Sequence, residues 1–384
     1  MGKLENLASY IEAVANNDTD IATYRKFEQD ILEVNADELF DLFYSRLSHE
    51  NQRDVLVYLD KLMHVFYQSL KHKQVTLTKD SFLDHLHQEN NQLSIKLENI
   101  KTKLKNNNLI QEKENLHILF DELSQFNVHY LKKENILFPY LEKKHEKFHG
   151  VSIMWTLHDQ TRQSLNHVLS LLLEKDPNEA QLKKAIGQYF FNAYGLIQKE
   201  EAILFVVAQA QCSINEFAHM REQSFEYGFA FIDTPLYYKV DELHTNKDQW
   251  LYSTKTGKLT YDQLTLFLDT LPMDCTIVDE NDKVIYFNNP TNRFFPRSPA
   301  IIGREVVNCH PADSVSTVVE IVDSFKQNKR DSATFWIDFK GRKLLIQYFP
   351  MRDENNQYKG VIEVTQDISE TIHIKGQKRL LDWD

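Results

Sequence analysis

Apolar residues recur every three or four positions along the first part of the chain, which is the period of an amphipathic α-helix. Within residues 1–77 this spacing is clearest from Leu39 to Leu47 and from Leu56 to Phe66. Proline does not occur in this stretch, and glycine occurs only at Gly2. The pattern therefore predicts an all-α N-terminal region over residues 1–77.

Four longer amphipathic segments follow between residues 78 and 212. The first begins near Thr78 or Ser81, because either side chain can cap a helix N-terminus. The second runs from about residue 112 to residue 142. Asp176-Pro177 separates the third from the fourth, because proline breaks the hydrogen-bond ladder of a helix. Four successive helices of this length predict a four-helix bundle over residues 78–212.

Each of these four helices places a histidine or a glutamate on its apolar stripe. The side chains are His85 and Glu89 on the first helix, His129 on the second, His158 on the third and Glu200 on the fourth. Residues four apart point the same way, so His85 and Glu89 face inward together. Facing imidazoles and carboxylates are how helical bundles hold metal ions. The pattern predicts a polar site inside the bundle, with a hydrogen-bonded His–Glu pair as the alternative for the first helix.

The second and fourth helices contain a weak internal repeat. The segment HYLKKENILFPYLE, residues 129–142, is echoed by LIQKEEAILF, residues 196–205. Two such helices favour a site that they share, although a charged patch before an apolar run is also typical of a solvated helix face. Aligning Phe138 with Phe205 places Lys133 opposite Glu200, Glu134 opposite Glu201 and His129 opposite Leu196.

The hydrophobic period changes from that of a helix to that of a strand after Leu271. The stretch CTIVDENDKVIYFN predicts two strands around a turn at Asn281-Asp282. Helical pieces are expected near Thr291 and from Asp313 to Gln327, and three further strands in SATFWIDF, KLLIQYFPMRD and KGVIEVTQDIS. This order predicts an α+β domain over residues 261–384, which a helix and linker over residues 213–260 join to the bundle.

These motifs also carry a family resemblance. DHLHQEN, HYLKKENILFPYLE, MWTLHDQTR and QKEEAILF resemble the hemerythrin-like (HHE) cation-binding bundle. The strand order, IIGREVVNCHPADS and the Asp-Ile-Ser at residues 367–369 resemble a PAS domain, and the terminal RLLDWD extends that resemblance. The whole chain resembles the bacterial DUF438 proteins, in which a helical region precedes such a bundle and a PAS domain follows it.

The resemblance implies two non-haem irons bridged by carboxylates within the bundle. It predicts metal binding through His85, His129, His158 and Glu200, with Glu89, Glu134 and Glu201 as nearby carboxylates. A di-iron centre and a mononuclear one are both compatible with this set. The fold class it implies is a multidomain chain with an all-α N-terminal region, a hemerythrin-like four-helix bundle and an α+β PAS domain.

Two positions depart from the HHE pattern. Lys133 stands where that pattern has a glutamate four residues after His129, and Leu196 stands where it has a histidine four residues before Glu200. On a regular helix Glu134 points roughly 140° away from His129, and a π-bulge is needed to bring it round. Alternatively, Lys133 pairs with Glu200 and replaces a metal charge, which leaves a mononuclear, an asymmetric or a lost site.

The PAS resemblance leaves the ligand of that domain open. Cys309-His310-Pro311 suggests haem, although a His-Pro-acid segment also occurs in PAS domains that bind none. PAS domains sense ligands or pair with proteins, so a homodimer through this domain is compatible with the sequence. No kinase, cyclase or DNA-binding unit follows Ser369 in the sequence, and we therefore expect output through an unknown protein partner.

Composition narrows the class of protein. The 384 residues carry a net charge of −12, which argues against nucleic-acid binding, and no apolar run is long enough to span a bilayer. The N-terminus contains acidic residues where a secretory signal would be apolar. Cys212, Cys275 and Cys309 lie far apart, which fits the reducing cytoplasm.

The sequence favours a regulatory protein over an enzyme, because it contains no nucleophilic triad, P-loop or dinucleotide motif. The leading hypothesis is a cytoplasmic iron-binding sensor that responds to O₂, nitric oxide or redox state, with the PAS domain as relay or second input. Two alternatives stand beside it. One is a di-iron repair factor for iron–sulfur clusters, and the other is a metal-free interaction scaffold.

Overall fold

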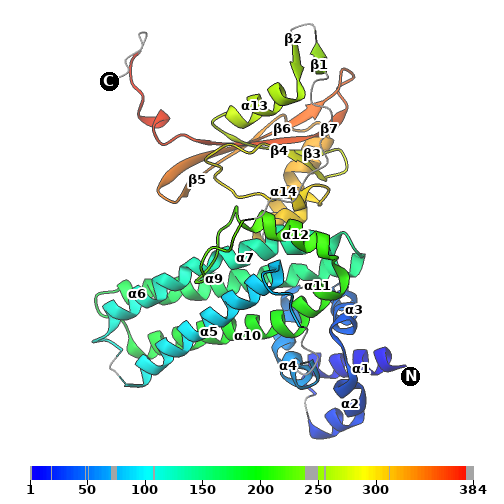
Figure 1. Cartoon of the computed structure of the whole chain (residues 1–384), viewed down its shortest axis with the longest axis vertical. Helices are drawn as coiled ribbons and strands as arrows, with labels where there is room; N and C mark the ends of the chain where they lie inside the picture. Colours follow the sequence, from blue (N-terminus) through cyan, green and yellow to red (C-terminus); the bar gives the residue numbers. More distant parts are fainter. Residues whose placement is uncertain are drawn as a thin grey trace. The chain divides into compact units, whose positions relative to one another are not determined.

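The chain divides into two compact units, residues 1–240 and residues 241–384 (Figure 1). None of the helices within the described ranges is long and apolar enough to cross a membrane. The computed structural model describes residues 2–18, 20–47, 49–50, 52–70, 76–106, 109–237, 250–254, 257–310 and 312–377.

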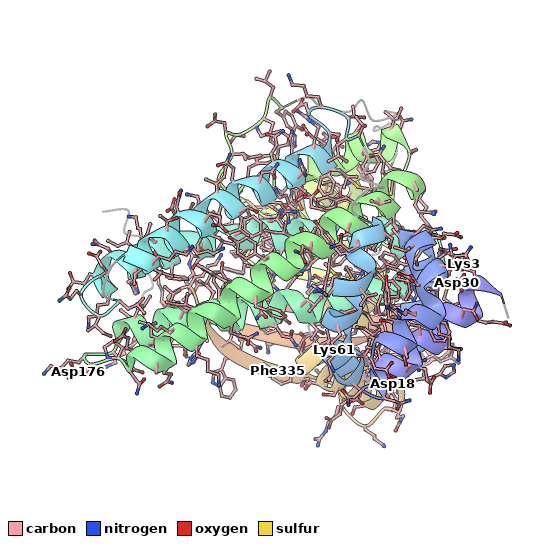
Figure 2. All side chains as sticks on the ribbon, turned by 90° about the horizontal axis from the view of Figure 1, so that it is seen from below. Lys3, Asp18, Asp30, Lys61, Asp176 and Phe335 are labelled. Carbon is pink, nitrogen blue, oxygen red and sulfur yellow. The ribbon has the colours of Figure 1, made fainter. Side chains whose placement is uncertain are left out.

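Four short helices open the first unit. Their apolar faces, among them Leu7, Ile11, Leu39 and Phe66, are fully buried in one hydrophobic core that continues into the bundle. Charged side chains such as Lys3 and Lys61 lie at the periphery of these helices (Figure 2). The helices are α1 (Lys3–Ala15), α2 (Ile21–Glu33), α3 (Ala36–Leu47) and α4 (Gln52–Leu70).

Four long helical segments form the bundle. The third packs against the second and the fourth, and the first packs against the same two, which closes the bundle. The first is α5 (Phe82–Asn106) and the third is α9 (Ser152–Leu173). The second consists of α6 (Lys113–Leu123), η2 (Ser124–Phe126), α7 (Asn127–Lys132), η3 (Lys133–Leu137) and α8 (Phe138–Glu142). The fourth consists of α10 (Glu179–Lys199), η5 (Glu200–Leu204) and α11 (Phe205–Gln211).

Local signals set the ends of these helices. Asp176 lies at the tip of the bundle, in the turn between α9 and α10, as its Asp-Pro sequence predicted (Figure 2). Asn178 then caps α10, because its side chain accepts a hydrogen bond from the backbone N–H of Gln181 at 3.0 Å. A short 3-10 segment, η4 (Glu146–Val151), connects the second segment to α9.

Each half of the sequence repeat contains one π-helical turn. These turns are η3, which begins at Lys133, and η5, which begins at Glu200. Pro139 follows η3 and has no backbone N–H to donate, which favours a wider turn before it. No proline accompanies η5, so this explanation covers only the first turn. The two turns start at residues that the sequence alignment had placed opposite each other.

Helix α12 (Ile214–Ser224) follows the bundle and begins with a capping box between Ser213 and Glu216. In the second unit β1 (Trp250–Thr254) and β2 (Gly257–Thr260) form an antiparallel hairpin, followed by α13 (Tyr261–Thr270). A five-stranded antiparallel sheet has the order β4-β3-β7-β6-β5. Its strands are β3 (Asp274–Asp279), β4 (Val284–Phe287), β5 (Ala333–Phe339), β6 (Arg342–Arg352) and β7 (Tyr358–Asp367), with α14 (Ala312–Lys326) between β4 and β5.

The second unit confirms the predicted strand order and corrects one helix. The segment near Thr291 is a turn, and the short helices of this connection lie later, at η6 (Pro299–Ile301) and η7 (Val306–Cys309). The buried carboxylate of Asp274 accepts hydrogen bonds from the backbone N–H groups of Phe294 and Phe295 at 2.9 and 3.1 Å. Because these two N–H groups bond to Asp274, they are not available for the backbone hydrogen bonds of a helix. The predicted fold class, a helical region with a four-helix bundle followed by an α+β domain, is confirmed.

Candidate metal centre

A cluster of polar side chains lies in the interior of the bundle, where apolar residues are usual. Glu89 from α5, His129 from α7, His158 from α9 and Glu200 at the start of η5 are all buried to at least 99%. Burying ionisable groups is unfavourable unless they are paired or bind a metal. Their partners therefore decide what the cluster can do.

His129 is held on both sides of its ring by carboxylates. Its Nδ1 lies 2.8 Å from Glu89 Oε2, and its Nε2 lies 2.9 Å from Glu200 Oε2. The ring of Phe126 stacks on the imidazole with 4.5 Å between centroids, which fixes the orientation of the ring. His129 is thus a rigid bridge between the first and fourth helices of the bundle.

His158 is held in a similar way on one side only. Its Nδ1 lies 2.7 Å from Glu134 Oε1, and the ring lies against those of Tyr130 and Phe138 at 4.6 and 5.9 Å. Its Nε2 is buried and has no hydrogen-bond partner among the described residues. Burial and the nearby charge of Lys133 hold the pKa of His158 well below its ordinary value, so the ring is neutral near pH 7.

The π-turn at η3 explains which residues reach the centre from the second helix. A regular helix would direct Glu134 well away from the side of His129. In the structure Glu134 binds His158 instead of joining His129, and Lys133 contacts Glu200. The turn therefore lets three successive residues, Lys132 to Glu134, all point into the bundle, and all three are buried.

Three cationic side chains pair with the three buried carboxylates. Lys132 Nζ lies 2.5 Å from Glu89 Oε1, and Lys133 Nζ donates to Glu200 Oε1. Burial alone would raise the pKa of Glu200, but the charge of Lys133 and the contact with His129 outweigh it and lower the pKa. Both lysines are fully buried, which is tolerable because each ammonium has a carboxylate partner.

Arg162 makes the third pair and closes the side of the site. Its Nη2 lies 2.9 Å from Glu134 Oε1, and its Nε donates to Asn127 Oδ1 at 2.7 Å. A cleft of about 270 Å³ is lined by Arg162 together with Tyr130 and eight other residues of the second, third and fourth helices. The buried ring of Tyr130 lies between this cleft and His158, on which it stacks.

The other two predicted residues of the bundle lie at the edge of the cluster. His85 Nε2 is 2.7 Å from Asp80 Oδ1, and its buried Nδ1 has no hydrogen-bond partner among the described residues. Glu201 accepts from Asn90 at 3.0 Å and lies 2.8 Å from His87 Nδ1. Within the described part of the chain, no three His, Cys, Asp or Glu side chains stand close enough together to enclose a metal as they are.

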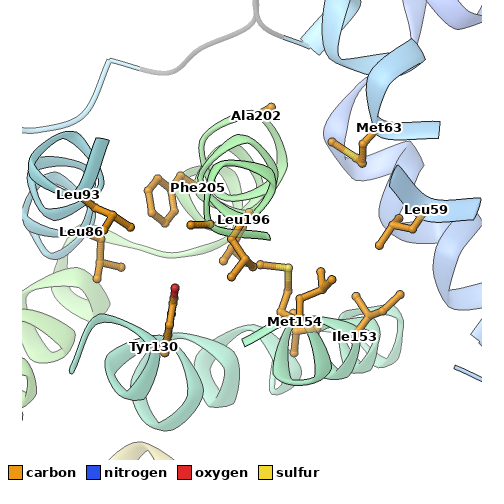
Figure 3. Close-up of a cluster of buried hydrophobic side chains, with 14 of the residues drawn as sticks. Leu59, Met63, Leu86, Leu93, Tyr130, Ile153, Met154, Leu196, Ala202 and Phe205 are labelled. Atoms are coloured by element: carbon orange, nitrogen blue, oxygen red, sulfur yellow. The ribbon is translucent and has the colours of Figure 1, made fainter. Parts of the chain in front are cut away.

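Sequence reasoning missed several contributors to the centre. Asn90 donates to Glu200 Oε2 at 3.0 Å, and Lys132 and Arg162 complete the ion pairs. Lys132 lies three residues after His129, so helical spacing contained a signal for it, whereas Asn90 directly follows Glu89 and points to another side of a regular helix. Leu196 lies inside the bundle with Leu86, Leu93 and Phe205, where the HHE pattern has a ligand (Figure 3).

Among the described side chains, the donor set lacks ligands for a second metal ion. His129 and His158 each direct Nδ1 to a buried carboxylate, which is the arrangement that orients the other ring nitrogen toward a metal. Glu200 lies within hydrogen-bond distance of His129 Nε2 and offers the third ligand. Lys133 and Leu196 occupy the two positions where further ligands would be expected.

The candidate ligands of the second unit are Cys309, the last residue of η7, and His310, which follows it. Cys309 Sγ is 3.7 Å from the backbone oxygen of Glu305. Burial, together with the charge of Arg297, lowers the pKa of His310 to about 4, so this imidazole is neutral near pH 7. Their role in haem binding stays a prediction.

Comparisons with known proteins agree with this architecture. Residues 78–208 match the family model of the hemerythrin HHE cation binding domain, and residues 264–369 match that of a PAS domain. The chain therefore contains a hemerythrin-type bundle followed by a PAS domain. A comparison with curated proteins found no match.

Several solved structures are similar to parts of the chain. The C-terminal domain of a Streptococcus mutans protein is 26% identical, with 33% of this chain and 98% of that chain covered and a TM-score of 0.31. The PAS domain of a Colwellia psychrerythraea protein is 19% identical, with 28% and 97% covered and a TM-score of 0.23. The PAS domain of Bordetella pertussis BvgS is 19% identical, with 29% and 88% covered and a TM-score of 0.24.

Proposed function

We propose that this chain is a cytoplasmic sensory protein of the DUF438 type, in which the bundle binds one iron ion and the PAS domain takes part in the response. His129, His158 and Glu200 would hold the ion. The matches to an HHE cation-binding domain and to a PAS domain support the two halves of this proposal. Cys212, Cys275 and Cys309 are present as thiols, which fits a reducing compartment.

The contact between His129 and Glu200 is the observation that carries the proposal. In a neutral imidazole one ring nitrogen donates a hydrogen bond and the other bears a lone pair. If Nδ1 donates to Glu89, the lone pair of Nε2 faces the carboxylate oxygen of Glu200 at 2.9 Å. Two electron-rich atoms at that distance require a positive charge between them. A proton or a metal cation can supply it.

The second histidine favours a metal over a proton. His158 has a buried Nε2 without a hydrogen-bond partner among the described residues, and its pKa is held low. A neutral imidazole with a free nitrogen is the form that binds metals. Two histidines and one carboxylate with open positions are the ligand set of non-haem iron(II) sites. Bound iron(II) would supply a redox-active centre with affinity for small diatomic ligands.

The chemistry of the centre does not favour a second ion. Lys133 stands where the HHE pattern has a bridging glutamate, so the second helix offers no carboxylate at that position to hold two ions together. Leu196 offers no ligand on the fourth helix. A di-iron repair factor for iron–sulfur clusters is therefore less well supported than a mononuclear sensor.

The lysines also argue for a reversible site. With Lys132 on Glu89 and Lys133 on Glu200, both carboxylates are neutralised without any metal. The bundle therefore avoids the penalty of unpaired buried charge when the site is empty. A protein that is folded in both states can report occupancy through a conformational equilibrium. We infer that the output passes to an unidentified protein partner.

Metal analysis of anaerobically purified full-length chain, with an optical spectrum, tests the proposal. We expect about one iron per chain and much less in Glu200→Gln, because the amide of glutamine is a poorer ligand than a carboxylate. Glu179→Gln serves as the control, since Glu179 is an exposed glutamate on the same helix. Equal iron in the wild type and in Glu200→Gln would contradict the proposal.

A further inference from the structure

The segment after α12 folds back onto the buried cluster. Residues 228–237, called here the strap, bring the backbone N–H of Ala230 to within 2.8 Å of Glu89 Oε1. Ala230 is 99% buried, so this hydrogen bond is shielded from water. The strap therefore contacts the carboxylate that holds His129, although Ala230 and Glu89 lie 141 residues apart.

Two aromatic side chains of the strap cover the cluster on either side of Ala230. The ring of Phe229 meets His85 edge-on at 5.5 Å, and Lys132 Nζ lies 4.4 Å from its centroid. The ring of Phe231 stacks on Phe126 at 6.0 Å. Phe126 in turn stacks on His129, so both aromatic contacts lead to the buried cluster.

The backbone of the strap is strained at its centre and anchored at its end. Phe231 has φ +62°, a left-handed conformation that is uncommon for a large side chain and persists only when its surroundings hold it. Arg221 Nη2 donates to the carbonyl of Leu236 at 2.5 Å, and Tyr237 donates to Glu222 at 3.0 Å. In sequence, the strap is the last described segment before the second unit, which begins at residue 241.

We propose that the strap positions His129 for the cation and communicates the occupancy of the site to the chain that leads into the second unit. The inference rests on the proposed function. Ala230 and Lys132 fix the carboxylate of Glu89, and Glu89 fixes the orientation of His129. A strap that holds the contact between Ala230 and Glu89 therefore favours metal binding. By thermodynamic linkage, a bound metal favours this state of the strap to the same degree.

Hydrogen exchange of the full-length protein tests this coupling, with anaerobic Fe(II) as the probe. We expect exchange at the Ala230 amide to slow about tenfold when Fe(II) is added, in line with the effect of outer-shell contacts on metal affinity. Phe229→Ala should weaken Fe(II) binding by a similar factor. Phe229→Tyr keeps the ring and should restore the affinity.

Leu236→Ala is the matched control, because this strap side chain is 72% exposed and far along the segment from Ala230. Unchanged amide exchange in α9 of the Phe229→Ala variant shows that the bundle is still folded, and Phe231→Ala provides a second variant. If Fe(II) binds and neither strap exchange nor the variants respond, the inference is wrong and the proposed function stands. If the wild type binds no Fe(II), the proposed function fails and the coupling fails with it.

Discussion

The ammonium group of Lys133 donates a hydrogen bond to the carboxylate of Glu200, and both side chains are buried away from water. The HHE pattern has a glutamate at the position of Lys133, so a cation stands where a metal-binding carboxylate was expected. The pair keeps Glu200 ionised in the interior of the bundle, because the lysine charge lowers the pKa of the carboxyl. Its removal should therefore change stability and metal binding in opposite directions.

Lys133→Glu tests this expectation. In the presence of a chelator it places two carboxylates together, and breaking a buried pair costs about 3–5 kcal/mol. A divalent cation should recover much of this loss, and the number of ions bound per chain should rise. Chemical denaturation with chelator and with Fe(II), followed by metal analysis, measures both effects.

Lys183→Glu is the control for this variant, because Lys183 is exposed and pairs with Glu179 on the surface of α10. Reversing that charge should change stability by less than about 1 kcal/mol. If Lys133→Glu were equally mild with chelator, the ammonium of Lys133 would not be paired in the interior.

His158→Gln tests the second ligand. Glutamine can still donate a hydrogen bond to Glu134, so the bundle should remain folded while the free imidazole nitrogen is lost. Loss of a ligand should weaken Fe(II) binding at least as much as loss of an outer-shell partner, about 10–100-fold. Anaerobic titration of the metal-free protein gives the dissociation constant.

His167→Gln on the same helix is the matched control, because His167 is exposed. We expect its Fe(II) affinity to equal that of the wild type. Equal affinities for the variants at 158 and 167 would exclude His158 as a ligand.

The sequence predicted the buried polar residues more reliably than their partners. Helical spacing identified His129, His158 and Glu200 as inward, because apolar periodicity reports which face of a helix is buried. It did not show that His85 turns to Asp80, since both residues lie near a helix end where the backbone leaves the regular period. Pairing depends on side-chain direction, which spacing alone does not determine.

The contact between Ala230 and Glu89 lay beyond any sequence pattern. Its donor is a backbone N–H, which every residue except proline possesses, so no residue type marks it. The π-turns are an intermediate case. The sequence repeat aligned Lys133 with Glu200, where the two π-turns begin. A π-bulge was considered for the second helix, because it can turn neighbouring residues inward together.

The second unit should lose stability as the pH falls from about 6.5 toward 4, because of His310. Burial and Arg297 lower its folded pKa to about 4 from the usual 6.5, so the unfolded chain takes up a proton first as the pH falls. The unfolding free energy that depends on a neutral His310 is therefore fully present above about pH 6.5 and falls progressively below that pH. The shift corresponds to at most about 3 kcal/mol.

Denaturation of the full chain at several pH values, in the wild type and in His310→Gln, checks this dependence. The difference in unfolding free energy between the two should shrink as the pH falls through this window. His373→Gln serves as the control, since His373 is exposed. A difference that stays constant from pH 7 to about pH 4 would show that His310 titrates normally in the folded unit.

Two glycines of the sheet should respond very differently to alanine. Gly360 on β7 has φ +134°, and a methyl group there would overlap the backbone oxygen of Val278 on the neighbouring strand β3. Gly341, in the turn between β5 and β6, has φ +77° with open space around its Cα. Both variants incur the strain of an alanine at positive φ, about 1–2 kcal/mol, but only Gly360→Ala must also push two strands apart.

We expect Gly360→Ala to lower the unfolding free energy of the second unit by about 2 kcal/mol more than Gly341→Ala, as measured by urea denaturation. Equal losses in the two variants would mean that β3 and β7 are not packed in this register.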